Sequence, residues 1–410
     1  MDNEPINQPI NADFEILSQK PIPKNKPTLK TILKHLGLFI ATFISVSVIG
    51  SMFVGLGNSV SVIGPLTLPG AEDLKRGMLF ASLLLGFLTF HEFGHYFAAV
   101  YHNIQVSLPY YIPLPLGIGT LGAVIRIKER IHETKKLFDI GVAGPLAGFV
   151  VSLIVLLIGF STLPEPSFVQ DLGGHEELKN YVAEYGVYPT VMPEEEEEEG
   201  TTLIVGNTLL FSFLASFFDN VPPMWEMYHY PFLFAGWLGL FFTALNLMPV
   251  GQLDGGHILY SLLGYKNHRT VARLFYTFIA ILAGIESVPL IHSLIGPYDT
   301  SFGAISWLLW GSILFSVMTI AFNKDRKWVS IMAPLSLILS SVYIYLIAGP
   351  TGAQPSSIWM VWLFFITFLV KVEHPPVTFY KPLSTRRKVL GWLSMLIFVL
   401  CISLNPLSMQ

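Results

Sequence analysis

The chain has 410 residues, of which 52% are hydrophobic and only 13% are charged, and its formal net charge is -4. A soluble domain has roughly 45–50% apolar and about 25% charged residues, so this composition indicates a protein whose solvent is largely lipid. The single cysteine excludes an intramolecular disulfide framework and a cysteine-based zinc cluster. The net charge itself says little about partners, and we expect the lipid bilayer but no nucleic acid among them.

Residues 1–34 precede the first long apolar stretch, and we expect them to form a flexible tail. The lysines close to that stretch are Lys20, Lys24, Lys26, Lys30 and Lys34. Because basic residues beside membrane spans favour the cytoplasmic side, this tail is predicted to be cytoplasmic.

Nine apolar stretches follow, which we interpret as membrane-spanning helices. They cover residues 36–57, 77–101, 137–160, 229–250, 271–295, 304–322, 331–348, 356–370 and 389–404. Along this path every basic cluster except Lys75 and Arg76 falls on the cytoplasmic side, and the glutamate run at 194–199 falls outside. We therefore predict an all-α polytopic membrane protein.

Two parts are expected within the membrane region. Residues 35–265 would form a catalytic core, and residues 266–410 would add C-terminal membrane helices. The bacterial cytoplasmic membrane is the expected location. The oligomeric state does not follow from the sequence.

The apolar segment 201–218 is omitted from the nine spans, although it is free of charge. If it crossed the bilayer, the next span would run in the opposite direction. A re-entrant or interface-lying segment is the alternative, which is tolerated where protein or a water-filled cavity covers the backbone.

The segment HEFGH, residues 91–95, lies late in the second predicted span. Side chains four apart share one face of a helix, so His91 and His95 can bind one metal ion, with Glu92 placed to activate water. This is the pattern of a zinc hydrolase. Burying ionisable side chains inside a bilayer costs free energy unless they bind a metal, face a water-filled cavity or pair with another group. This favours a functional interpretation of the motif.

A catalytic zinc ion takes three protein ligands, so a third must come from elsewhere. Asp254 is the candidate, because Pro249 and Gly251 break the end of the fourth predicted span beside it. Three other residues compete with it: Asp139, Glu286 and His257. We expect Asp139 to favour a helix N-terminus, Glu286 to make a polar contact between helices, and His257 to support the site or cap a helix.

The loop after the second span, residues 107–130, is rich in proline and glycine. Its residues 123–128 alternate in side-chain type and are predicted to form a small membrane-associated strand that could pair with an extended substrate. A plain loop is the alternative. Three glycines spaced along the third span, Gly141, Gly144 and Gly148, are expected to form a helix-packing face rather than a substrate gate.

Together these motifs resemble the site-2 protease family of intramembrane zinc metalloproteases. The likeness rests on HEFGH at 91–95 and on the pattern N-x-x-P-x-x-x-L-D-G from Asn246 to Gly255. Further likeness, in GTLGAVIRIK at 119–128, FDIGVAGPLAG at 138–148 and EHPPV at 373–377, points to the branch of plant plastid and bacterial proteins related to the ethylene-dependent gravitropism-deficient proteins.

The resemblance implies one catalytic zinc ion held by His91, His95 and Asp254, with Glu92 as general base and acid. It also implies that Asn246 assists the reaction intermediate and that the substrates are transmembrane proteins. A PDZ domain, common in that family, is not expected between residues 161 and 228. The alternatives are a catalytically silent membrane scaffold and an ion transporter that uses Glu286.

Overall fold

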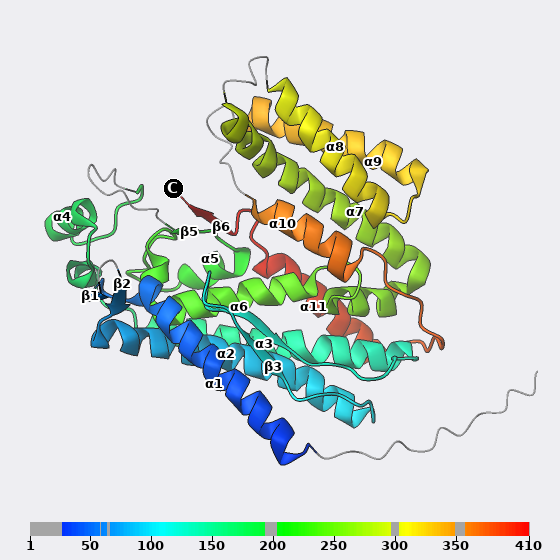
Figure 1. The fold of residues 1–410 in the computed structure, drawn as a ribbon, viewed down its shortest axis with the longest axis horizontal. Coiled ribbons are helices and arrows are strands. Elements are labelled where there is room, and N and C mark those ends of the chain that lie inside the picture. Colours follow the sequence, from blue (N-terminus) through cyan, green and yellow to red (C-terminus); the bar gives the residue numbers. More distant parts are fainter. Residues whose placement is uncertain are drawn as a thin grey trace, which may run out of the picture.

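The computed structural model describes residues 27–57, 59–63, 66–192, 203–296, 303–348 and 357–409. These residues form α-helices and three small antiparallel strand pairs (Figure 1). The helices are α1 Leu29–Val54, α2 Ala71–Tyr101, α3 Thr134–Ser161, α4 Glu176–Tyr185, α5 Leu209–Ala215, α6 Pro231–Leu247, α7 Asp254–Ile295, α8 Ala304–Ala321, α9 Arg326–Val342, α10 Ile358–Phe365 and α11 Thr385–Cys401. The strands are β1 Ser59–Ile63, β2 Leu66–Pro69, β3 Tyr110–Pro113, β4 Thr120–Val124, β5 Leu203–Val205 and β6 Leu407–Met409. Short 3₁₀ helices are η1 Pro166–Asp171 and η2 Met227–His229, and π-helical turns are η4 Tyr343–Ala348 and η5 Ile366–Val370.

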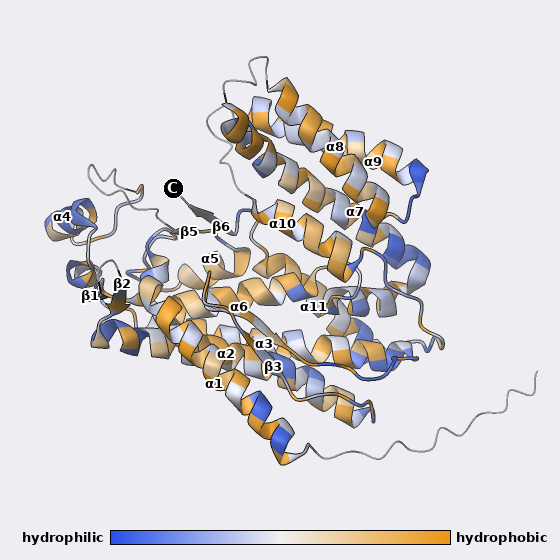
Figure 2. Ribbon diagram, in the orientation of Figure 1, coloured by the Kyte–Doolittle hydropathy of each residue, from blue (hydrophilic) through white to orange (hydrophobic). Residues whose placement is uncertain are grey.

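Six of these helices are long and apolar enough to cross a membrane: α1, α2, α3, α7, α8 and α9 with its π-helical extension. Hydrophilic residues gather near helix ends and on α4, while the helix bodies are mainly apolar (Figure 2). The chain is therefore an integral membrane protein of the polytopic helical class. Each of the nine predicted spans overlaps one helix, but α6, α10 with η5, and α11 are shorter, so a count of nine crossings stays a prediction.

The predicted tail, residues 1–34, overlaps the first turns of helix α1. Helix α1 already begins at Leu29, because the Thr28 hydroxyl accepts a hydrogen bond from the backbone N–H of Thr31 and caps the helix. Residues 1–26 and the glutamate run at 194–199 lie outside the described residues, so the expectations for them are untested.

Close contact between helices defines the core around α2, which packs against α1, α3 and α6 (Figure 1). Small residues occupy the contact points. A side chain at Gly77 would meet the Ser47 carbonyl oxygen of α1, and one at Gly236 of α6 would meet Leu156 of α3. Lipid tails are as apolar as the helices, so such close backbone packing, more than apolar burial, holds membrane helices together.

The loop after α2 contains a strand, as predicted, but this strand lies earlier in the chain and forms a β-hairpin with a second strand. Strand β4 covers Thr120–Val124 and pairs with β3, instead of spanning residues 123–128. Past Val124 the pairing continues only as an isolated bridge between Val106 and Ile127. The positive φ angles of Gly117 and Gly119 let the chain turn back between the two strands, which places the strand earlier than side-chain alternation alone predicted.

The apolar segment 201–218 does not cross the membrane as a helix in its described part. It forms the three-residue strand β5 and the seven-residue helix α5. A helix of that length extends only about 10 Å, far less than the roughly 30 Å hydrocarbon thickness. The nine-span path, which omits this segment, is consistent with that.

Helix α7 bends at Gly264, which has φ 74° inside the helix. The boundary expected between residues 265 and 266 falls beside this bend, in a helix that runs on, and the two-part division stays a prediction. Beyond the bend, α7 packs against α8, α9 and α10.

A buried ion-pair network ties this C-terminal part together. The Arg273 side chain is 1% exposed and donates to Glu373 Oε1 at 2.6 Å and to Asp325 Oδ2 at 2.8 Å. Arg269 also binds both carboxylates. Because Glu373 opens the segment 373–377, this network fixes that segment against α7.

We predict that Arg273→Met destabilises the protein by about 3 kcal/mol, because removal of one partner leaves buried carboxylate charge poorly compensated. The free energy of unfolding, measured by SDS titration in mixed micelles, tests this. The exposed Arg326 provides a control, and Arg326→Gln should change stability by less than about 0.5 kcal/mol. Equal stabilities for the two variants would contradict the proposed role of the network.

Candidate metal centre

Helix α2 presents two imidazoles side by side in the core. His91 and His95 lie one helical turn apart and are 3% and 7% exposed. Gly94, between them in sequence, lets α2 approach α3, since a side chain there would meet the Ala143 carbonyl oxygen. The two histidines are therefore held at a helix contact, shielded from lipid.

Asp254 reaches the same place from a different helix. It is the first residue of α7, directly after the turn that follows α6. In this turn Gly251 has φ 51°, and its N–H donates to the carbonyl oxygen of Val372 at 2.9 Å. A side chain at Gly255 would collide with the Leu247 carbonyl oxygen, so the turn can close only with glycine there.

The three side chains converge with the geometry of one ion-binding site. His91 Nε2 and His95 Nε2 are 3.1 Å apart, and Asp254 Oδ2 is 3.6 Å from the first and 3.2 Å from the second. Zinc bonds nitrogen and oxygen at about 2.0–2.2 Å, so two ligand atoms in a tetrahedral site are separated by roughly 3.3 Å. The structure thus brings together the three residues that the sequence analysis proposed as ligands of one ion. Two imidazole nitrogens and one carboxylate oxygen fit a metal ion.

Hydrogen bonding prepares His95 for that role. His95 Nδ1 donates to the carbonyl oxygen of Ile140 at 2.8 Å, so in the neutral ring Nε2 carries the lone pair that points at Asp254. The ring is thereby fixed from α3, the helix that also carries the predicted glycine face.

That glycine face is a packing surface, as predicted. A side chain at Gly144 would lie 2.1 Å from His95 Nε2, and one at Gly148 would lie 3.2 Å from His91 Nδ1. At Gly141 the neighbour is His257 of α7. Because these three positions of α3 are glycines, the imidazole rings can pack directly against the helix backbone.

Glu92 lies beside the cluster and is 6% exposed. Its Oε2 accepts a hydrogen bond at 2.8 Å from the backbone N–H of Ile125, which follows β4 directly. The hairpin after α2 is therefore attached to this carboxylate. No pattern in the sequence predicts this bond.

Asn246 makes a local hydrogen bond within its own helix. It lies near the end of α6, and its amide nitrogen donates to the carbonyl oxygen of Phe242 in the same helix at 3.0 Å. Among the described residues it makes no hydrogen bond to the cluster.

The competing residues are engaged elsewhere. Asp139 does not occupy the first turn of α3 as expected, and instead binds Arg387 of α11 and His102. Glu286 accepts from the backbone N–H of Trp359, which is the predicted polar contact between helices.

His257 adds a partner that the sequence did not assign. It shares a hydrogen bond of 2.8 Å with His374, from the EHPPV segment. The motif itself was visible in the sequence, but its contact with α7 was not. The segment thus supports the helix start that carries Asp254.

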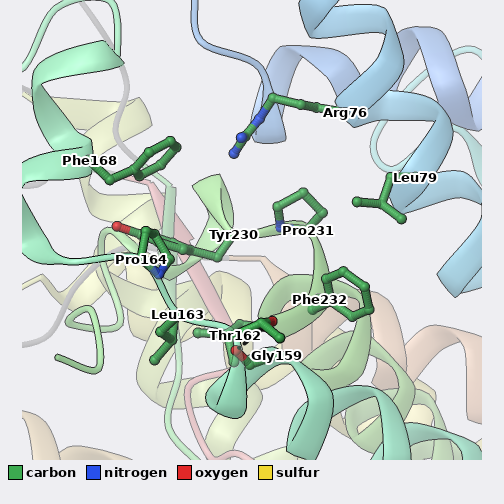
Figure 3. A pocket seen from close by; sticks show the side chains of 11 residues that line it. Arg76, Leu79, Gly159, Thr162, Leu163, Pro164, Phe168, Tyr230, Pro231 and Phe232 are labelled. Carbon is green, nitrogen blue, oxygen red and sulfur yellow. Dashed lines mark hydrogen bonds between the residues drawn. The ribbon is translucent and has the colours of Figure 1, made fainter. Parts of the chain in front are cut away.

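A separate pocket of 310 Å³ opens at the other end of α2 (Figure 3). Arg76 projects over it, and Phe168 and Tyr230 lie on its wall. Arg76 is about 22 Å from His91 along the helix axis, and none of the clustered residues lines the pocket. It is therefore not the site of the metal chemistry.

These features define a membrane-embedded protein in which two histidines and one carboxylate form a candidate metal centre. The profile of peptidase family M50 matches residues 79–285, which contain all three candidate ligands. The chain belongs to peptidase family M50.

Two similar curated proteins are named as probable zinc metalloproteases. The chain is 32% identical over 208 residues to the probable zinc metalloprotease EGY1, chloroplastic, of Arabidopsis thaliana, covering 50% of this chain and 34% of that protein. It is 27% identical over 225 residues to the probable zinc metalloprotease EGY2, chloroplastic, of Oryza sativa subsp. japonica, covering 54% and 36%. The chain thus spans about a third of the length of these relatives. No solved structure matches.

The names of these relatives place them in the chloroplast, which gives no support to the bacterial cytoplasmic membrane expected from the sequence. What the structure supports is the coarser location, an integral membrane protein.

We predict that Gly144→Ala removes most of the bound metal, because the new methyl group would occupy the position of the ligand atom His95 Nε2. The metal content of the purified full chain, measured by inductively coupled plasma mass spectrometry, tests this prediction. Gly86→Ala is the matched control, since a side chain at Gly86 of α2 would meet nothing within 4 Å. If Gly144→Ala retained as much metal as Gly86→Ala, the site would not be packed as described.

Proposed function

We propose that the chain is a zinc-dependent intramembrane endopeptidase that hydrolyses peptide bonds of membrane-spanning proteins. One observation carries the proposal, the meeting of His91, His95 and Asp254 beside Glu92 within apolar helices. Membership of peptidase family M50 and the names of the relatives support it.

His91, His95 and Asp254 would hold the zinc ion. When bound, zinc supplies a Lewis acid that polarises the scissile carbonyl and makes a water molecule acidic enough to ionise near neutral pH. Two imidazoles and one carboxylate leave a coordination position open, as catalytic zinc sites do.

Glu92 is the residue we assign to proton transfer. Its Oε2 accepts from the Ile125 N–H, so the carboxylate is oriented while Oε1 has no described hydrogen bond. Oε1 can take a proton from the attacking water and return it to the leaving amine nitrogen. The surrounding core keeps other water away.

Asn246 is proposed to stabilise the oxyanion. Its amide is held by the weak i to i−4 bond to Phe242, and a change in side-chain torsion would free both amide hydrogens. Loss of one such donor commonly costs about 10²- to 10³-fold in rate.

The substrate would lie along the free edge of β4. Backbone groups alternate between the two edges of a strand, and Arg126 and Lys128 bond towards the β3 side, through Ser107 and Gln105. Ile125 points the other way, towards Glu92. An extended substrate added at this edge would bring its peptide bonds to the carboxylate, which a helical substrate cannot do because its amides are already bonded.

The nine crossings and a cytoplasmic N-terminus are part of the same proposal. Along this path the end of α2 and the start of α7 lie near the same face, which one shared metal ion requires. The basic residues beside α1 and between α2 and α3 support that orientation.

We predict that Glu92→Gln keeps its zinc but loses at least about 10²-fold in cleavage of a transmembrane reporter, because an amide cannot accept the proton. Gel-based cleavage in proteoliposomes, with zinc content measured on the same samples, tests this. Glu72→Gln serves as the control, since Glu72 is exposed at the far end of α2 and forms an ion pair with Lys75. Wild-type cleavage by Glu92→Gln would refute the role of Glu92.

We predict that Ile125→Pro slows cleavage by about 10-fold or more, because proline lacks the N–H that Glu92 accepts and a hydrogen bond to a charged group contributes about 1.5–3 kcal/mol. Ile125→Ala keeps that N–H and should retain near wild-type cleavage. Zinc content should be unchanged in both. If the two variants cleaved equally, the hairpin would not orient Glu92.

A further inference from the structure

A second cluster of metal-type ligands lies away from the first. It consists of His175, which directly precedes α4, with Glu226 and His229 at η2, just before α6. Their ligand atoms all lie within 4.8 Å of one another. The proposed peptidase chemistry makes no use of these residues.

The cluster belongs to the opposite end of the helix core. Arg76, near the start of α2, donates to the carbonyl oxygen of His229 at 2.7 Å and also binds the carbonyl oxygen of Val54 at the end of α1. Arg76 is about 22 Å along α2 from His91. The two clusters cannot share an ion.

The imidazole geometry repeats that of the first cluster. His175 Nε2 and His229 Nε2 are 3.2 Å apart, and their rings are nearly perpendicular, at 88°. In the first cluster His91 and His95 have Nε2 atoms 3.1 Å apart and rings at 71°. Both separations match the roughly 3.3 Å edge between nitrogens around a tetrahedral zinc ion.

The third group supplies the charge. Glu226 is 0% exposed, and its Oε1 lies 4.0 Å from His229 Nε2. A tetrahedral zinc ion needs about 3.3 Å between these two atoms, so the carboxylate would move by less than about 1 Å to bind it. Buried carboxylates are stable where they are paired or coordinate a metal, and here two imidazole nitrogens face the same space.

The backbone is arranged around the same point. His175 adopts the left-handed conformation with φ 61°, which is uncommon for a residue with a side chain. This brings its ring across to His229, although 54 residues separate the two in the chain. The segment from η1 to α4 is thereby joined to the start of α6.

We propose that His175, Glu226 and His229 form a second site for a divalent metal ion, with a structural role. Zinc suits two imidazoles and one carboxylate, and a water molecule would be its fourth ligand. The site fastens the segment that carries η1 and α4 to the ends of α2 and α6, on the face opposite the catalytic cluster. The alternative is a metal-free hydrogen bond between the two rings.

Zinc stoichiometry of the purified full chain distinguishes these. After dialysis against a weak chelator and addition of Zn²⁺, we expect about two ions per wild-type chain and about two in Glu92→Gln. We expect about one in His175→Ala and in Glu226→Gln, and about two in the control His132→Ala, whose ring bonds Thr378 and belongs to neither cluster. One ion per wild-type chain, undiminished in His175→Ala, would overturn the proposal.

A second measurement does not depend on the folding of those variants. In the double variant His91→Ala/His95→Ala, the second cluster is the group of metal-type ligands that remains within the described part of the chain, and Co²⁺ serves as its probe. Visible d–d absorption of four-coordinate Co²⁺ in this variant, lost on adding Glu226→Gln, supports the site, and no such absorption overturns it. If the double variant bound as much zinc as wild type, the catalytic assignment would fail while the second site stood.

Discussion

The whole arrangement depends on bringing two imidazoles and one carboxylate, from two helices far apart in the chain, within about 4 Å inside an apolar medium. His91 and His95 come from α2, and Asp254 comes from the start of α7. Isolated ionisable groups in lipid are costly, so their burial is stable only if they are satisfied together. A shared metal ion satisfies all three.

Much of the surrounding structure can be understood as what makes that meeting possible. Glycines on α3 leave space for the imidazoles, and Gly251 and Gly255 let the turn after α6 close. From the C-terminal part, Val372 accepts from Gly251, and His374 binds His257. The C-terminal helices, which the sequence analysis treats as an addition to the catalytic core, thus support the turn before Asp254. They do so through the segment around residues 372–374, which the Arg273–Glu373 ion pair holds in place.

The sequence was informative wherever the chemistry is local. The four-residue spacing of His91 and His95 follows from helix geometry, and the glycine and proline residues around Asp254 predicted a broken helix end. Apolar length placed every membrane helix approximately. Contacts between residues far apart in the chain could not be predicted from the sequence. No spacing rule joins Ile125 to Glu92, His374 to His257, or His175 to His229. The strand at 123–128 was misplaced for a related reason, since turn glycines, not side-chain alternation, fixed its start.

The claim that Asp254 binds the catalytic zinc ion is tested most directly by replacing its oxygen ligand with sulfur. In the variant Asp254→Cys, X-ray absorption at the zinc edge should reveal a zinc–sulfur distance of about 2.3 Å that wild type lacks. The native thiol, Cys401, is buried in α11, so the wild-type chain is a suitable reference. Zinc bound in that variant at the full wild-type stoichiometry with no sulfur neighbour would contradict the account, because Asp254 would then not be a ligand.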